Sequence, residues 1–173
     1  MYDNYWQKVV DGLMAALLDE RQTAVFYAQL RDMSRSFAGV DAFAEARKDE
    51  LDHARTLTKL LEELTGMTPK EAVQPVYPSQ CKSYCDGVLQ SIQGERNAFT
   101  EYSDIIKISP YARVNEALVE IINDEEVHLA KFNKLYEIEC QHKQQQPYQP
   151  YQPYQKDATS QKGSKNQDDG GNR

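Results

Sequence analysis

Two copies of the pattern Glu-x-x-His are the residues of this sequence that could do chemistry. Each copy follows another Glu at the same distance of 30 residues. Residues three apart on a helix share one face, so each pattern presents a carboxylate and an imidazole together. The carboxylate could then bridge two cations while the imidazole caps one of them. The candidate metal ligands are therefore Glu20, Glu50, His53, Glu95, Glu125 and His128.

The charge and the repetition of this set favour metal binding. Four carboxylates carry a charge of about −4, which is costly inside a protein unless two divalent cations neutralise it. Mixed imidazole and carboxylate ligation suits iron or manganese. A single Glu-x-x-His is common on helices that bind no metal, with the His in the core and the Glu in solvent. Two copies at one distance favour the metal centre over that interpretation.

A duplication relates the two halves of the chain. An offset of 75 residues carries the first three candidate ligands onto the last three without a gap. The same offset pairs Asp49 with Asp124 and Tyr27 with Tyr102. We therefore expect two related helical hairpins that pack about a pseudo-two-fold axis. The six ligands should meet near the bundle centre, around two metals about 3.5–4 Å apart, with the Glu of each Glu-x-x-His nearest the axis.

Two further pairs could support the ligands. A metal-bound His usually donates its second N–H to an oxygen acceptor, so we expect Asp124 to pair with His53, and Asp49 with His128. The alternative acceptor is the Asp four residues earlier on the same helix, and both could instead be ordinary exposed acids. Tyr27 and Tyr102 could donate hydrogen bonds to ligand carboxylates or pack as plain core residues.

The elements that must position these residues read as four long helices. Apolar residues recur at three- and four-residue steps, and we expect helices over about 3–34, 40–64, 79–108 and 111–141. Gly66 is the expected stop of the second helix. Pro69, Pro75 and Pro78 exclude a continuous helix in the connection that follows. Two short links and one long crossover predict an all-α, ferritin-like four-helix bundle over residues 1–143.

The composition changes abruptly after the bundle. Residues 144–173 begin with a Tyr-Gln-Pro repeat and continue as a polar, Gly-rich run. Such a segment cannot bury enough apolar surface to offset its chain entropy, so we expect a disordered tail.

Charge and hydropathy exclude several function classes. The chain has 173 residues and a net charge of −7, with no basic stripe, so we expect no nucleic-acid partner. No apolar run approaches the roughly 20 residues that span a bilayer, and no secretory signal is visible. Three cysteines, Cys81, Cys85 and Cys140, predict no disulfide framework and hence a reducing, cytoplasmic setting. Cys81 and Cys85 could form a redox pair or be small apolar fillers.

At its candidate ligands the sequence resembles the rubrerythrin branch of the ferritin-like di-iron family. The resemblance covers about residues 5–140 and includes Tyr27 and Tyr102. It implies a non-haem centre of two iron ions that reduces hydrogen peroxide, or that oxidises iron(II) with peroxide or dioxygen. Rubrerythrins carry a second domain with two Cys-x-x-Cys pairs, which this sequence lacks, so an external electron donor such as a rubredoxin-type protein is expected. Ala98 replaces an additional Glu of the family, so slower turnover is expected.

Two other functions fit the same residues. The ligand set could hold two manganese ions as a catalase, which would need no external reductant. The bundle could also be a metal-stabilised scaffold or coat protein whose tail mediates interactions. The oligomeric state stays open, and a homodimer is one possibility.

Overall fold

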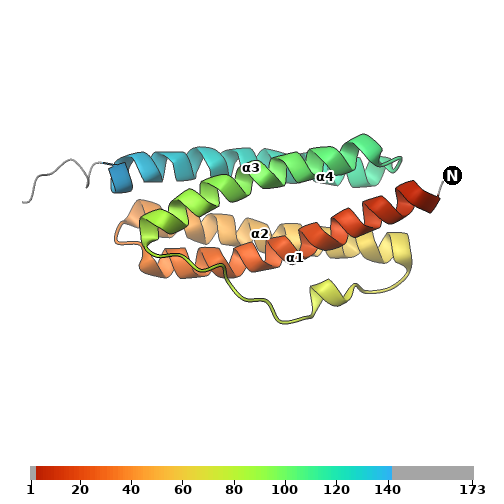
Figure 1. The fold of residues 1–173 in the computed structure, drawn as a ribbon, viewed down its shortest axis with the longest axis horizontal. Helices are drawn as coiled ribbons and strands as arrows, with labels where there is room; N and C mark the ends of the chain where they lie inside the picture. Colours follow the sequence, from red (N-terminus) through yellow and green to blue (C-terminus); the bar gives the residue numbers. More distant parts are fainter. Residues whose placement is uncertain (1–2, 142–173) are drawn as a thin grey trace, which may run out of the picture.

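The computed structural model describes residues 3–141, and within them four long helices form a bundle (Figure 1). Helix α1 spans Asp3–Met33, α2 Phe37–Thr65, α3 Tyr84–Ile108 and α4 Ala112–Leu135. Helices α1 and α2 form one hairpin, and α3 and α4 form the other (Figure 1). No strand occurs in this part of the chain. The predicted all-α four-helix bundle is confirmed, and the predicted tail, 144–173, lies outside the described residues.

Local capping sets the helix ends and corrects two predicted boundaries, the starts of α2 and α3. Ser36 caps α2 by accepting the N–H of Gly39, so α2 begins at 37 rather than 40. Helix α3 begins at 84 rather than 79, because Ser83 accepts the N–H of Asp86. Gly66 ends α2 as predicted, since its φ of 74° is left-handed and its N–H bonds to the preceding turn. After α4, residues Tyr136–Gln141 continue as a π-helical turn, η2.

The crossover between the hairpins is anchored to α1. It runs over residues 66–83 and contains one short 3₁₀ turn, η1, at Lys70–Ala72. The guanidinium of Arg21 donates a hydrogen bond to the backbone carbonyl of Glu71 in this turn. Arg21 follows the candidate ligand Glu20 directly, so this contact ties the crossover to the part of α1 that carries the site.

The bundle core consists of two apolar clusters with a polar layer between them. One cluster includes Leu17, Leu57 and Leu118, and the other includes Phe43 and Phe132. On every helix the candidate ligands lie in sequence between residues of the two clusters. The apolar packing on both sides therefore holds the polar layer in place and shields it from water.

The expectation that the cysteines form no disulfide was wrong. Cys85 at the start of α3 forms a disulfide with Cys140 in η2, and Cys81 is free. The bond brings together residues that are 55 apart in sequence, which spacing alone could not reveal. Cys81 and Cys85 are therefore not a redox pair in this structure, and the cysteines no longer indicate a reducing setting. No described helix is both long enough and apolar enough to cross a membrane.

Candidate metal centre

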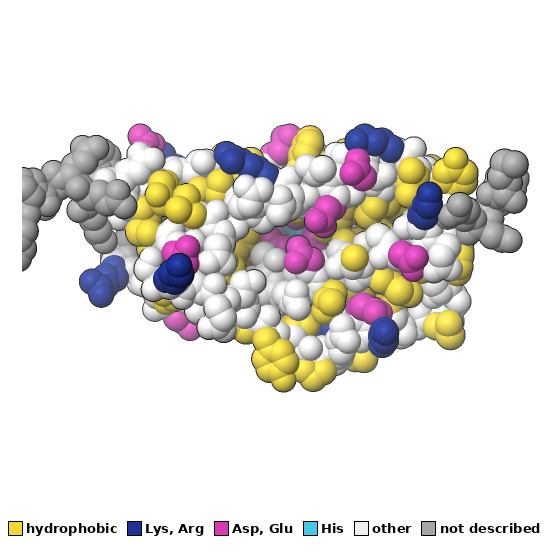
Figure 2. Space-filling view, in the orientation of Figure 1, with side chains coloured by type: hydrophobic (Ala, Val, Ile, Leu, Met, Phe, Trp, Pro, Cys, Tyr) yellow, Lys and Arg dark blue, Asp and Glu magenta, His cyan; other side chains and the backbone are white. Residues whose placement is uncertain are grey.

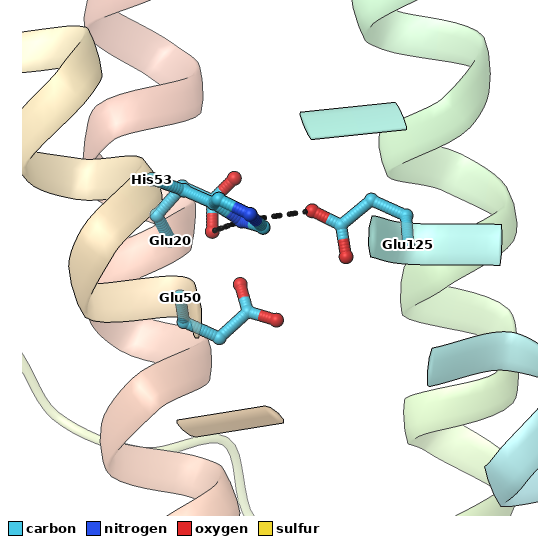
Figure 3. A group of neighbouring side chains, drawn as sticks. All are labelled: Glu20, Glu50, His53 and Glu125. Atoms are coloured by element: carbon cyan, nitrogen blue, oxygen red, sulfur yellow. Dashed lines mark ion pairs between the residues drawn. The ribbon is translucent and has the colours of Figure 1, made fainter. Parts of the chain in front are cut away.

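All four helices contribute to one buried cluster of carboxylates and imidazoles. Helix α1 supplies Glu20 and α3 supplies Glu95, while α2 and α4 each supply the Glu and His of one Glu-x-x-His pattern. Each of the six side chains belongs to a residue that is at most 5 % exposed. Figure 3 shows Glu20, Glu50 and His53 facing Glu125 across the interior of the bundle. The structure thus brings all six predicted residues together.

The six residues form two overlapping groups, each with donor atoms within 4.8 Å of one another. The first group contains Glu20, Glu50, His53 and Glu125, and the second contains Glu50, Glu95, Glu125 and His128. Each group has its own histidine and its own outer carboxylate. Glu50 and Glu125 belong to both groups, which is the arrangement expected of carboxylates that bridge two positions.

In both histidines Nδ1 faces the carboxylate cluster. His53 Nδ1 lies 3.2 Å from Glu125 Oε1 and 3.5 Å from Glu20 Oε2. His128 Nδ1 lies 3.1 Å from Glu125 Oε2 and 3.5 Å from Glu50 Oε1. Because Nδ1 is the inner nitrogen in each half, it is the atom that would bind a metal.

The outer nitrogens contact the two predicted aspartates. His53 Nε2 lies 3.2 Å from Asp124 Oδ2, and His128 Nε2 lies 3.3 Å from Asp49 Oδ2. These contacts cross between hairpins, as the duplication predicts, and do not involve the Asp on the same helix. A carboxylate at Nε2 favours the tautomer with the proton there, which leaves the lone pair of Nδ1 free for the cluster.

The two predicted tyrosines hold the outer carboxylates. Tyr27 on α1 donates a hydrogen bond to Glu95 Oε1 on α3, and Tyr102 on α3 donates one to Glu20 Oε1 on α1. Both tyrosines are almost fully buried. Each hydroxyl is bonded to one oxygen of an outer carboxylate, so the two tyrosines orient these carboxylates.

No protein-family model matches this chain, and no curated protein matches it. Among solved structures, a conserved hypothetical protein, rv2844, from Mycobacterium tuberculosis is similar, with a TM-score of 0.64 at 15 % sequence identity. The match covers 86 % of this chain and 99 % of that one. At this identity the likeness concerns the fold alone. The resemblance to rubrerythrins therefore reaches no further than the bundle and its buried carboxylate and imidazole groups.

Burial and mutual repulsion raise the pKa of two carboxyl groups. Burial, followed by the charges of Glu20 and Glu125, raises the pKa of Glu50 well above its ordinary value. Burial and Glu125 likewise raise the pKa of Glu95, although the hydrogen bond from Tyr27 acts in the opposite direction. Without metal, these groups therefore retain protons at a pH where exposed carboxyl groups are ionised.

His53 supplies positive charge to this cluster of carboxyl groups. Burial alone would lower the pKa of His53, but hydrogen bonds to Glu125 and Glu20 outweigh it and raise the pKa to about 11. Burial would raise the pKa of Glu125, but hydrogen bonds from His128 and His53 lower it to about 2. In the metal-free protein an imidazolium proton thus supplies part of the positive charge that the carboxylates require.

Unsatisfied atoms show that the cluster fits a cation. Glu20 Oε2, Glu50 Oε1, Glu125 Oε1 and His53 Nδ1 are buried, and beyond the contacts of 3.2–3.5 Å between these carboxylates and imidazoles they have no partner. Leaving such groups without partners is costly, and a cation among them would satisfy all of these atoms at once. The donor set, in which carboxylate oxygens join imidazole nitrogens, is one that divalent iron or manganese accepts.

Sequence reasoning missed the acids that lie beside the ligands on one face of the bundle. Asp19 and Glu101 line a small cavity together with the ligands Glu20 and Glu95. The signal that could have identified them is a break in the duplication, because the 75-residue offset places Gly94 opposite Asp19 and Glu101 opposite Phe26.

Proposed function

We propose that this chain is a non-haem di-iron oxidoreductase that reduces hydrogen peroxide, or oxidises iron(II) with peroxide or dioxygen. The observation that supports it is the pair of overlapping four-residue groups that share Glu50 and Glu125. One isolated group would suit a single structural ion, whereas two groups with common carboxylates suit two adjacent ions. Two bound iron(II) ions would supply the two electrons that cleavage of an O–O bond requires.

The residues of this chain would bind the two iron ions and orient the ligand side chains. His53, His128 and the four carboxylates provide the donors, and the aspartates at Nε2 hold each imidazole in its ligand orientation. Tyr27 and Tyr102 fix the outer carboxylates. The two apolar clusters limit access of water to the centre.

Electrons for repeated turnover are expected to come from a separate protein of the rubredoxin type. In the described part of the chain, Cys85 and Cys140 are bonded to each other, and only Cys81 carries a free thiol. That inventory provides no set of four cysteines to hold an electron-transfer iron.

Metal content and peroxide reactivity test the proposal. Protein purified from its native host should hold two iron ions per chain, and Glu50→Gln should lose this stoichiometry while the control Glu116→Gln retains it.

After anaerobic reduction, stopped-flow mixing with hydrogen peroxide should oxidise the centre, and turnover should stop without an added reductant. Steady release of oxygen without a donor, strongest with manganese, would show a catalase instead. A centre that responds to neither peroxide nor dioxygen would indicate a scaffold.

A further inference from the structure

An opening between α1 and α3 leads from the surface towards the candidate metal centre. Figure 2 shows this face, with acidic side chains gathered around a hollow at its middle. An outer cavity of about 200 Å³ and an inner cavity of about 30 Å³ share the lining residues Asp19, Thr23, Tyr27, Gly94 and Glu101. The inner cavity is also lined by Glu20, Glu50, Glu95 and Glu125. Its volume suffices for a water-sized particle.

The chemistry of this opening selects cations. Neither cavity is lined by a Lys or Arg among the described residues, and the outer one presents hydroxyl, amide and carboxylate oxygens from Asp19, Thr23, Asn97 and Glu101. Within residues 3–141, Asp19 and Glu101 form no salt bridge, although other exposed acids, such as Glu45, pair with a lysine. A cleft lined by unpaired negative charge raises the local concentration of cations.

The floor of the opening provides an independent indication of a ligand. Glu20 and Glu50 are at least nine-tenths buried and line the inner cavity. Glu20 Oε2 and Glu50 Oε1 form no well-aligned hydrogen bond, and the nearest imidazole nitrogen lies 3.5 Å from each. A second groove that reaches the centre, between α3 and α4, differs in character. Besides the ligands Glu95 and Glu125, it is lined by Phe99, Leu129, Glu126 and the cation Arg96, so a positive charge offsets its one additional acid.

Small residues on α3 leave the opening unobstructed by side chains. The duplication places Gly94 opposite Asp19, so one side of the opening carries an acid where the other carries no side chain. A Cβ added at Gly94 would meet no atom within 4 Å. Ala98, one turn further along α3, also lines the inner cavity. A side chain of ordinary size at either position would narrow the passage.

We propose that the opening between α1 and α3 is a port through which hydrated divalent cations reach the centre, with Asp19 and Glu101 as the first carboxylates they meet. This inference rests on the proposed metal centre and adds the route by which it is filled. At the port, carboxylate oxygens of Asp19 and Glu101 replace part of the water bound to the cation. The cation then passes to the buried carboxylates of Glu20 and Glu50.

The kinetics of cobalt binding test the port. Stopped-flow absorbance follows Co²⁺ binding to the metal-free full-length chain at low ionic strength. The double variant Asp19→Asn with Glu101→Gln should bind roughly tenfold more slowly, because local negative charge no longer attracts the cation. The difference should shrink in high salt, and two ions should still bind at the end. The matched control, Glu116→Gln with Glu120→Gln, removes the same charge elsewhere and should bind at the wild-type rate.

A second variant tests the passage by volume. Gly94→Leu adds a side chain where space is free and should slow Co²⁺ binding at every salt concentration. The port would be overturned if both port variants bind two Co²⁺ ions at the wild-type rate. It would also be overturned if the charge control slows binding as much as the Asp19 and Glu101 double variant does. Either result would leave the proposed function standing. A wild-type chain that binds no Co²⁺ would overturn the metal centre and the port together.

Discussion

The two histidines have distinct nitrogen atoms with distinct tasks. In each, Nδ1 faces the buried carboxylates and Nε2 faces an aspartate from the other hairpin. The aspartates differ in their surroundings, since the side chain of Asp124 is 55 % exposed and that of Asp49 is 25 % exposed. Water can replace a lost carboxylate more easily at the more exposed position, so the two halves of a symmetrical pattern are not equivalent.

Replacing either aspartate with alanine should weaken metal binding by about 10–100-fold, because the imidazole loses the acceptor that orients it. The larger loss is expected for Asp49→Ala, where less water can reach His128 Nε2. Titration of the metal-free variants with Co²⁺ measures the change. The conservative variants Asp49→Asn and Asp124→Asn keep an oxygen acceptor and should recover part of the affinity. If the alanine variants bind Co²⁺ as tightly as the wild type, the aspartates do not support metal binding.

The helical elements were more predictable than their connections. The six ligands could be found from sequence because the duplication repeats polar groups within apolar helical faces. The start of α3 was placed too early because no cap had been identified for this helix, and the structure shows that Ser83 accepts the N–H of Asp86. The disulfide was missed because it depends on the meeting of the start of α3 with η2. Asp19 and Glu101 were missed because they belong to no repeated motif, and helix packing places both beside the ligands.

The Cys85–Cys140 bond joins α3 to the turn that follows α4, so its loss should destabilise the second hairpin. Cys85→Ser should lower the free energy of unfolding by about 2–4 kcal/mol, because the open chain gains conformational entropy when unfolded. Urea unfolding measures the change, and reduction of the wild-type protein should reproduce it. The control Cys81→Ser removes the free thiol and should leave the midpoint unchanged. Identical unfolding of the oxidised and reduced wild type would contradict this prediction.

At the scale of the whole molecule, the buried charge makes the fold depend on its counterions. The chain carries a net charge of −7, and four carboxylates lie in the polar layer of the bundle. Protons or metal ions must supply the compensating positive charge. Protons do so through Glu50, Glu95 and His53, whose pKa values are all raised in the metal-free fold. Metal binding and proton binding are therefore alternatives at the same atoms.

The stability of the metal-free protein should consequently fall as the pH rises from 5 to 8. Glu50 and Glu95 keep protons in the folded state that they release on unfolding above their ordinary pKa of 4.5. His53 stabilises the fold fully below pH 6.5 and loses that contribution as the pH rises towards its folded value of about 11. Glu125 acts with the opposite sign, but only between about pH 2 and 4.5. The folded state thus binds more protons over the tested range, which lowers the free energy of unfolding by about 1.4 kcal/mol per pH unit for each proton retained.

Metal should reverse this dependence, because metal binding displaces those protons and tightens as the pH rises. Urea unfolding at pH 5, 6, 7 and 8, with and without saturating Co²⁺, provides the measurement. The stabilisation by Co²⁺ should be larger at pH 8 than at pH 5. Glu50→Gln, which removes one carboxyl group, should flatten the metal-free profile, whereas Glu116→Gln should leave it unchanged. A metal-free protein whose stability rises with pH across this range would show that the polar layer is not held by protons when the metal is absent.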